Sequence, residues 1–313
     1  MLCLFSHQFP RTVEHFLDRD RALKRRFREE TVTDMLMGGL MTLGGRRVMV
    51  EFPNEARTGA DMEWNFVNER TGRFFRILVQ AKRSFVLSND PAKPDFHDWR
   101  RHSYRELYHR TGSSSDQQAV VLCNEARSAA ATYPLYAFYN AGVTRALAEF
   151  GGQENVQGVS LADGYAIEQV VRGATTGAPG YGVKTHNKRV GAIAPYLRPF
   201  SALFCPSRVQ QLPPFAFAPR NAAEFFLVSS AEGIGVPMPP TPDDVRERVV
   251  TMQDEAIGQA DGDLPPVPVV ADRIPEDVQE LLGKRDADGI NRLKRWRVTF
   301  VSSETVDDTY EGG

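Results

Sequence analysis

The sequence predicts a mixed α/β (α+β) fold: a helical segment, a three-stranded antiparallel hairpin unit, a second helix and a further strand, followed by a C-terminal extension. Apolar residues recur with helical spacing between Thr12 and about Leu43. They alternate with polar residues over residues 61–67, and a Thr-Gly turn separates that run from a second apolar run at residues 74–82. With 313 residues, 42% of them hydrophobic, the chain can bury the core of one large domain or two modest ones.

The first half of the predicted unit runs from the helix into the hairpin. A glycine pair at residues 38–39 weakens or ends the helix. Residues 46–52 alternate in the manner of a strand and stop at a Pro-Asn pair. The second strand, residues 61–67, has large apolar side chains on one face and acidic and amide side chains on the other. A turn at residues 68–73 then leads into the third strand, which ends at Lys82.

The second half of the unit begins with helix-capping residues. Residues 113–116 supply N-cap candidates for a helix from Gln117 to about Ala130. Residues 133–139 form a short aromatic strand, and a further helix is expected near residues 161–171. The order of these elements predicts a compact unit of ordinary domain size.

The chain divides into three predicted parts. Residues 1–150 form the core domain, and residues 151–240 form an extension that packs on the core or regulates it. Residues 241–313 are punctuated by prolines, acidic and partly flexible, with a mobile tail after about Val301. The balance of charge also differs between the two ends of the chain. Residues 1–119 hold 20 basic and 16 acidic side chains, whereas residues 243–313 hold 9 basic and 17 acidic ones.

Composition limits the class of protein. The formal net charge of −2 excludes a uniformly basic nucleic-acid coat protein but leaves room for a local basic face. No apolar run approaches the ~18 residues of a membrane span. The three cysteines are odd in number and widely spaced, which argues against a disulfide framework and a paired-thiol zinc site and favours a reducing cytoplasm. Cys123 and Cys205 lie in apolar runs and are expected to be small core residues.

The most informative residues lie at the ends of the two hairpin strands. If the turn is symmetric, Asp61 lies opposite Gln80, and Lys82 projects from the same face two residues on. A carboxylate, an amide oxygen and the Ala81 carbonyl are oxygen ligands of the kind that Mg²⁺ prefers. A nearby lysine can orient an attacking water and stabilise charge on a phosphate. A register slip of one residue would turn the third strand's set to the other face.

Each of these residues also has an ordinary structural interpretation. Asp61 can be a turn residue at a strand edge, Gln80 a solvent-facing amide, and Lys82 an edge-strand charge that blocks aggregation. Glu63 shares their face but lies farther from Lys82, so we expect it to support the site from outside. The joint occurrence of Asp61, Gln80 and Lys82 on one face favours the chemical interpretation.

At these residues the sequence resembles the PD-(D/E)XK nuclease superfamily, in its Mrr-like variant with Asp followed by Gln-x-Lys. Asp61 matches the Asp, and Gln80-Ala81-Lys82 matches the Gln-x-Lys. By element order the resemblance covers roughly residues 27–140. Four segments in this range also look like an uncharacterised bacterial family related to those nucleases. These segments are Glu30–Asp34, Thr58–Trp64, Gln80–Arg83 and Pro134–Asn140.

The resemblance implies a restriction-endonuclease-like core and a nuclease dependent on Mg²⁺ or Mn²⁺. Such an enzyme hydrolyses phosphodiester bonds, here most simply as a DNA endonuclease in cytoplasmic bacterial defence against foreign or viral DNA. In that fold the first helix commonly donates a glutamate to the metal, which matches Glu30, with Glu29 as the competing choice. Asp61, Gln80, Ala81 and Glu30 are therefore the expected metal ligands, and Lys82 completes the catalytic set. Gln80 stands where many relatives have Glu, which removes one negative charge and predicts lower metal affinity.

A basic, aromatic-bearing stretch lies next to this motif, in residues 69–110. Its simplest interpretation is a solvated surface segment. Beside a nuclease site, its cations are expected to contact phosphates: Arg83, Lys93, Arg100, Arg101 and Arg105. The alternative is a non-catalytic nucleic-acid-binding or assembly module on the same fold. The sequence leaves open whether the protein forms a homodimer. It also leaves open whether a protein partner or signal regulates its activity through the second half of the chain.

Overall fold

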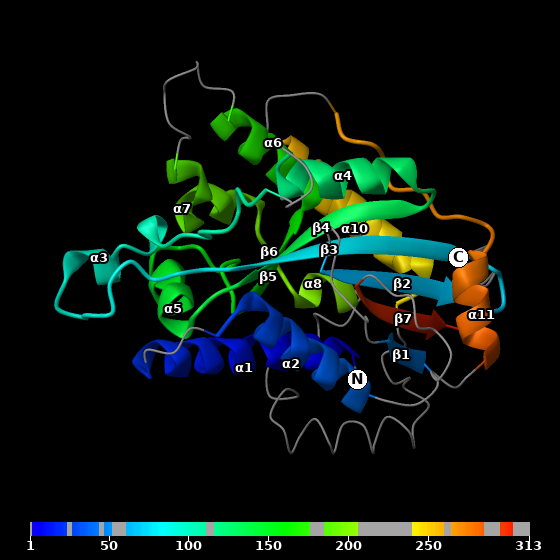
Figure 1. Ribbon diagram of the computed structural model, residues 1–313, viewed down its shortest axis with the longest axis horizontal. Helices are drawn as coiled ribbons and strands as arrows, with labels where there is room; N and C mark the ends of the chain where they lie inside the picture. The colour runs from blue at the N-terminus through cyan, green and yellow to red at the C-terminus, as the bar shows by residue number, and fades with distance from the viewer. Residues whose placement is uncertain are drawn as a thin grey trace, which may run out of the picture.

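The computed structural model describes residues 2–23, 27–43, 47–51, 61–110, 116–175, 185–205, 240–259, 264–284 and 295–302. It has the mixed α/β (α+β) architecture that the sequence predicts: a seven-stranded mixed sheet with helices on both faces (Figure 1). Among the described residues, no helix is both long and apolar enough to cross a membrane.

The sheet has the strand order β1-β7-β2-β3-β4-β5-β6. Its strands are β1 (Val48–Glu51), β2 (Met62–Asn68), β3 (Phe74–Arg83), β4 (Thr132–Tyr139), β5 (Val159–Asp163), β6 (Arg198–Pro199) and β7 (Trp296–Ser302). The longer helices are α1 (Leu2–Ala22), α2 (Glu29–Thr42), α4 (Gln118–Ser128), α5 (Gly142–Phe150), α6 (Gly164–Thr175), α10 (Pro242–Ile257) and α11 (Glu276–Lys284). The short helices are α3 (Pro94–His97), η2 (Trp99–Arg101), η3 (Thr185–Lys188), α7 (Val190–Ile193), η4 (Ala194–Tyr196) and α8 (Ser201–Phe204).

The β2–β3 hairpin has the register that its turn predicts. The two strands are antiparallel, and Glu63 lies opposite Leu78. Gly72 closes the turn with φ +73°, a left-handed conformation that glycine adopts without strain. β4 then runs parallel to β3 and places Tyr136 beside Gln80. The hairpin is central in the sheet, so every residue of β2 is buried rather than only one face.

The helical pattern between Thr12 and Leu43 is two helices and not the single one predicted. α1 begins at Leu2 and ends at Ala22, and α2 begins at Glu29. The stretch between them, residues 23–28, is rich in charged residues, and residues 24–26 lie outside the described residues. Glu29, the first residue of α2, approaches β3.

One face of the sheet packs against α1, α2, α8 and α10. Its core includes an aromatic cluster in which Trp64 contacts Phe200, Phe204 and Phe300 with ring centroids 5.9–6.5 Å apart. α10 begins with a capping box formed by Thr241 and Asp244, which satisfies two backbone donors at the start of the helix. This face therefore depends on chain segments from both ends of the sequence.

The other face packs against α4, α6 and α7, which cover Leu78, Tyr136 and Phe138. The helix predicted near residues 161–171 is in fact the end of a strand followed by a helix. Asp163 ends β5, and its carboxylate accepts a hydrogen bond from the Ala166 N–H, which caps the first turn of α6. The predicted cap residues 113–115 lie outside the described residues.

β7 comes from the acidic C-terminal region and lies second from one edge of the sheet, between β1 and β2. It pairs in parallel with β2 and antiparallel with β1. Because β5, β6 and β7 all belong to this sheet, the sheet continues past residues 150 and 240. The three-part domain division stays a prediction, and the expected mobile tail at residues 303–313 lies outside the described residues.

The structure corrects one expectation about cysteine. Cys3 and Cys205 form a disulfide, with Cα atoms 4.8 Å apart, where the odd number and wide spacing of the cysteines argued against one. The two residues are 202 positions apart, and only the packing of α8 beside α1 brings them together. Cys205 is therefore half-buried in a crosslink rather than a simple core residue. Cys123 is a buried free thiol, as expected.

Candidate active site

Asp61 and Gln80 meet at the end of the β2–β3 hairpin, as the register predicts. The Asp61 N–H donates to the Val79 carbonyl at 3.0 Å, which continues the hairpin pairing by one residue. Asp61 Oδ2 accepts hydrogen bonds from the Ala81 N–H at 2.8 Å and from Gln80 Nε2. Gln80 Nε2 also donates to the Ala81 carbonyl at 3.3 Å. The Gln80 amide thus contacts both of the other groups proposed as oxygen ligands, the Asp61 carboxylate and the Ala81 carbonyl.

Lys82 lies two residues farther along β3 and forms an ion pair with Glu29. Its Nζ is 3.0 Å from Glu29 Oε1, and the two side chains are only 2% and 15% exposed. Glu29 is the first residue of α2, preceded by Arg28 in an extended conformation. The start of α2 therefore brings this carboxylate to the end of β3.

Burial controls the charge of the two carboxyl groups. It raises the pKa of Asp61, although Lys82 and the hydrogen bonds from Ala81 and Gln80 act in the opposite direction. It also raises the pKa of Glu29 to about 7, against the attraction of Lys82 and with further repulsion from Asp61 and Glu106. Two poorly solvated carboxyl groups share a single lysine, and a cation placed between them would stabilise their ionised forms.

The amide of Gln80 fits a metal ligand. Its Oε1 atom is buried and has no hydrogen-bond partner among the described residues, whereas its Nε2 atom faces Asp61 and the Ala81 carbonyl. A buried acceptor without a partner costs about 1–3 kcal/mol. Rotation of the amide by half a turn exchanges the two atoms and brings Oε1 to the side of the Asp61 and Ala81 oxygens. The residues present therefore supply an oxygen donor set suited to Mg²⁺ or Mn²⁺.

The structure distinguishes the two candidate glutamates of α2. Glu29, the competing choice, is the residue that contacts Lys82. Glu30 is exposed and has no contact of this kind among the described residues, although its charge still raises the pKa of Asp61. Successive residues on a helix point about 100° apart, so only one of the pair can face the strand.

The predicted phosphate-contacting cations separate into two groups. Arg83 is nearly buried: its guanidinium pairs with the buried Asp20 and donates to the Phe27 carbonyl, just before α2. The other four are exposed: Lys93, Arg100, Arg101 and Arg105. Arg105 lies over the Phe85 ring at 4.7 Å from its centroid, and Arg83 lies over the same ring at 5.2 Å.

Arg100 and Arg101 lie on η2, in the segment that follows β3. Arg100 stacks on the Trp99 ring at 4.8 Å, and Arg101 pairs with Asp95 at 2.6 Å. Both guanidinium groups remain on the surface, where they are accessible to a polyanion.

Two parts of the site region were not foreseen from the sequence. Tyr136, next to Gln80 on β4, is fully buried, and its hydroxyl has no hydrogen-bond partner in the part of the chain that the structure describes. The alternation of the strand at residues 133–139 was a signal that could have placed it on this face. Arg83 was expected on the surface, and no local pattern pairs it with Asp20, which is 63 residues away.

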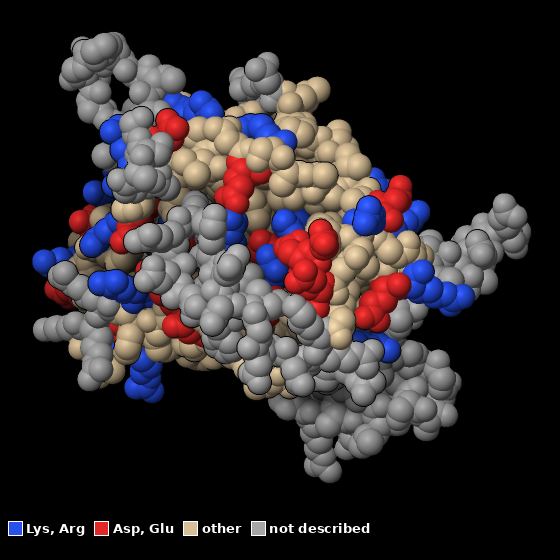
Figure 2. Space-filling model, turned by 45° about the vertical axis from the view of Figure 1, so that its right-hand side comes forward, with Lys and Arg blue, Asp and Glu red and all other residues tan. Residues whose placement is uncertain are grey.

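Glu63 belongs to a separate buried polar network. Its Oε1 atom is 2.9 Å from Arg297 Nε and 3.1 Å from Asn65 Nδ2, and Arg297 Nη2 is 2.9 Å from Asp277 of α11. Figure 2 brings the side of the molecule that carries α11 forward and shows acidic and basic side chains against one another near the middle of that view. The network therefore joins β2 to β7 and α11, and Glu63 supports the sheet beside the candidate site.

Together these features define an α+β protein with a largely buried cluster of two carboxyl groups, one amide and one lysine where α2 meets the end of a central β-hairpin. Over residues 2–307 the chain matches the family described as "Family of unknown function (DUF6615)", and it belongs to that family. No curated protein and no solved structure shows a significant match to the chain.

Proposed function

We propose that this protein is a divalent-metal-dependent nuclease with a restriction-endonuclease-like core. The observation that carries the proposal is the convergence of Asp61, Gln80 and Lys82 on one face of the hairpin, with Glu29 paired to the lysine. This is the arrangement that the resemblance to the PD-(D/E)XK superfamily predicts, with Glu29 replacing Glu30 as the residue contributed by the helix.

Asp61, Gln80, the Ala81 carbonyl and Glu29 are the groups that would hold Mg²⁺ or Mn²⁺. A bound divalent ion would lower the pKa of a coordinated water and offset negative charge on the phosphate. The Lys82 ammonium is close to both carboxyl groups, where it can orient the attacking water and stabilise the charge of the transition state. The Ala81 N–H fixes one oxygen of Asp61 and so sets the direction of the other.

The proposed substrate is nucleic acid, most simply DNA, cut internally. Lys93, Arg100, Arg101 and Arg105 are exposed on the segment that follows β3 and supply a surface for phosphates. A cytoplasmic role in defence against foreign or viral DNA is consistent with such an activity. Regulation by a partner or signal, or action as a homodimer, would belong to the same proposal.

The burial of the cluster favours one alternative. Lys82 is 2% exposed and Gln80 is fully buried, and Gln80 adds no charge to the metal ligands. A non-catalytic nucleic-acid-binding or assembly module could keep such a cluster for stability alone. That protein would bind DNA in a salt-sensitive manner without metal-dependent turnover.

Plasmid cleavage tests the proposal. The full chain should cut DNA with Mg²⁺ or Mn²⁺ and not with EDTA. Lys82→Ala should reduce the rate by ~10²–10³-fold, the usual effect of removing one electrostatic contact to the transition state. Lys188→Ala, in the short helix η3 (Thr185–Lys188), is a matched control that should cut normally.

Two outcomes would count against the nuclease. Undiminished cleavage by a folded Lys82→Ala protein would exclude the mechanism. Salt-sensitive DNA binding by the wild-type protein, with no cleavage under any divalent ion, would favour the non-catalytic module instead.

A further inference from the structure

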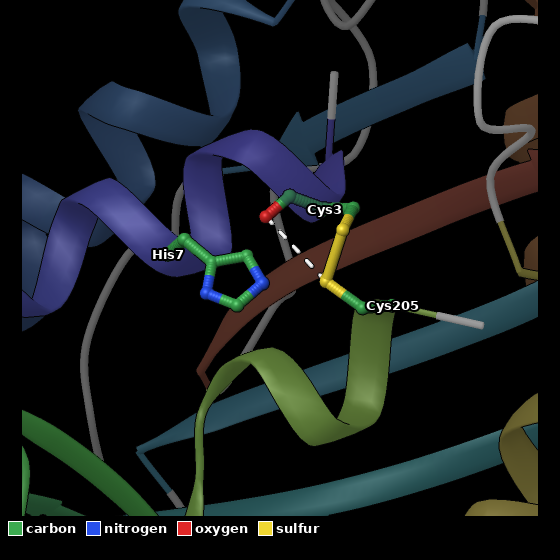
Figure 3. A group of neighbouring side chains, drawn as sticks. All are labelled: Cys3, His7 and Cys205. Atoms are coloured by element: carbon green, nitrogen blue, oxygen red, sulfur yellow. Dashed lines mark hydrogen bonds between the residues drawn. A yellow bond between two sulfur atoms is a disulfide. The ribbon is translucent and has the colours of Figure 1, made fainter. Parts of the chain in front are cut away.

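A second cluster of metal-ligating side chains lies away from the candidate active site. Cys3 and His7 come from the first two turns of α1, and Cys205 follows the end of α8 (Figure 3). One ligand atom from each of the three residues lies within 4.8 Å of the others. The nuclease proposal gives this cluster no role.

The geometry of the cluster is that of a ligand set. Cys3 and His7 are four positions apart on one helix, so their side chains share one face. Thiolate sulfur and imidazole nitrogen are the ligands that Zn²⁺ prefers, in contrast with the oxygen set near Asp61. The Ser6 hydroxyl is 3.6 Å from Cys205 Sγ and 2.7 Å from the Cys3 carbonyl oxygen, and so offers a hydrogen-bond partner to the sulfur.

We propose that Cys3, His7 and Cys205 form a Zn²⁺ site in the reduced protein, and that the disulfide is the oxidised, metal-free form of the same site. Disulfide sulfurs carry no thiolate charge, so the metal requires prior reduction. A dithiol supplies the two electrons: it becomes a disulfide, and its two protons pass to the sulfurs of Cys3 and Cys205. Binding of Zn²⁺ then displaces both protons.

Both forms of the site join the same two elements. The disulfide or the metal holds the start of α1 to the end of α8, whose Phe204 packs against Trp64 in the core. Only the reduced, metal-free protein lacks this connection. His7 is exposed, so the cluster is open to a reductant and to solvent, and water can complete the four ligands that Zn²⁺ usually takes.

Cobalt substitution tests this site in the full chain. The protein is reduced with a dithiol, freed of it without air and titrated with Co²⁺, whose thiolate complexes absorb light in a characteristic charge-transfer band. One Co²⁺ per chain should bind with this band, and Zn²⁺ should displace it. The oxidised protein should show no band until it is reduced. Mg²⁺ should not reduce this band, because Mg²⁺ prefers oxygen ligands and the oxygen site near Asp61 gives no thiolate signal.

Matched variants separate this site from other thiols and histidines. Cys205→Ser should abolish the band, whereas Cys123→Ala, at the buried free thiol, should keep it. His7→Ala, at an exposed position that should not affect folding, should weaken Co²⁺ binding by at least the ~10–100-fold that follows loss of an outer-shell partner. His97→Ala, at another exposed histidine, should bind normally.

Thermal unfolding gives a second measurement. Zn²⁺ should raise the Tm of the reduced wild-type protein but not that of Cys205→Ser. The proposal is overturned if the reduced protein, folded by circular dichroism, shows no thiolate band. It is equally overturned if His7→Ala and Cys205→Ser bind Co²⁺ as the wild type does, and the pair is then a disulfide alone. Neither result would bear on nuclease activity.

Discussion

Lys82 Nζ lies 3.0 Å from Glu29 Oε1, so an almost wholly buried ion pair joins the start of α2 to the end of β3. Such a pair differs from a surface ion pair, because removal of either partner leaves a charge without solvation. It also places a carboxyl group from the helix beside the Asp61 and Gln80 cluster of the hairpin. The position of Glu29 at the start of α2 therefore decides whether its carboxyl group can help this cluster to hold a cation.

The two glutamates of α2 should differ sharply when neutralised. Glu29→Gln removes the carboxylate that contacts Lys82 and should weaken Mg²⁺ binding and reduce DNA cleavage, whereas Glu30→Gln should leave both close to wild type because its side chain is exposed. Isothermal titration with Mg²⁺ and plasmid cleavage measure the two effects. If Glu30→Gln is the more impaired, the helix contributes the residue that the superfamily resemblance first indicated.

The pH dependence should follow Glu29. Burial raises its pKa from 4.5 to about 7, so the folded protein binds this proton more tightly than the unfolded chain does. Its contribution to stability is therefore most favourable at low pH, decreases as the pH rises from 4.5 to about 7, and is constant above that. Mg²⁺ needs the ionised carboxylate, so metal affinity should increase over the same window.

Measurements on either side of pH 7 check this expectation. The Kd for Mg²⁺ and the free energy of unfolding without metal should both change with pH in the wild type. In Glu29→Gln both dependences should flatten, because the titrating group is gone. An unchanged pH dependence in that variant would assign the titration to Asp61 or to another group.

Gln80→Glu should increase the affinity for Mg²⁺ and decrease the stability of the metal-free protein. A second carboxyl group beside Asp61 adds negative charge to the ligand set and should tighten Mg²⁺ binding by about tenfold, or ~1.4 kcal/mol. Without metal, two buried carboxyl groups in contact should lower the Tm. The control is Gln253→Glu, at a buried glutamine of α10 whose amide donates to the Pro265 carbonyl; it should lower the Tm without tightening Mg²⁺ binding.

Arg83 should prove structural, and Arg105 should contact phosphate. Arg83→Gln leaves Asp20, which is 1% exposed, with the Phe27 N–H but without its cation, and should cost about 3–5 kcal/mol in urea unfolding. Arg105→Gln should leave stability unchanged and reduce the slope of log K against log salt for DNA binding by about one. A reduced salt slope in folded Arg83→Gln would return Arg83 to the phosphate-contacting set.

The C-terminal strand should be required for the stability of the whole sheet. Arg297→Met removes the nearer of the two arginines paired with Glu63, leaving Arg76 Nε at 3.5 Å, and should destabilise the fold by about 3 kcal/mol. Adding Glu63→Gln should recover part of that loss, because the buried carboxylate that has lost its nearer cation is then gone. A double-mutant cycle in urea measures the coupling, and simple additivity of the two changes would show that β7 and β2 are not coupled through this pair.

Sequence patterns predicted the hairpin and the partners within it. Alternation in residues 61–67 and the turn at residues 68–73 are local signals, because neighbouring residues on one strand set both the face and the register. They placed Asp61 opposite Gln80, which the hydrogen bond between the two side chains and the observed register confirm. Lys82 follows two residues later on the same strand. Helix α4 and strand β4 were likewise found to within one or two residues.

Only the tertiary structure decided which distant segments complete that hairpin. The choice of Glu29 over Glu30 depends on how α2 packs beside β3, where Glu29 contacts Lys82. The insertion of β7 between β1 and β2, the pairing of Arg83 with Asp20 and the meeting of Cys3 with Cys205 all join residues far apart in the chain. Local periodicity reports which face of an element is buried, but the partner that buries it is selected by the packing of the whole chain.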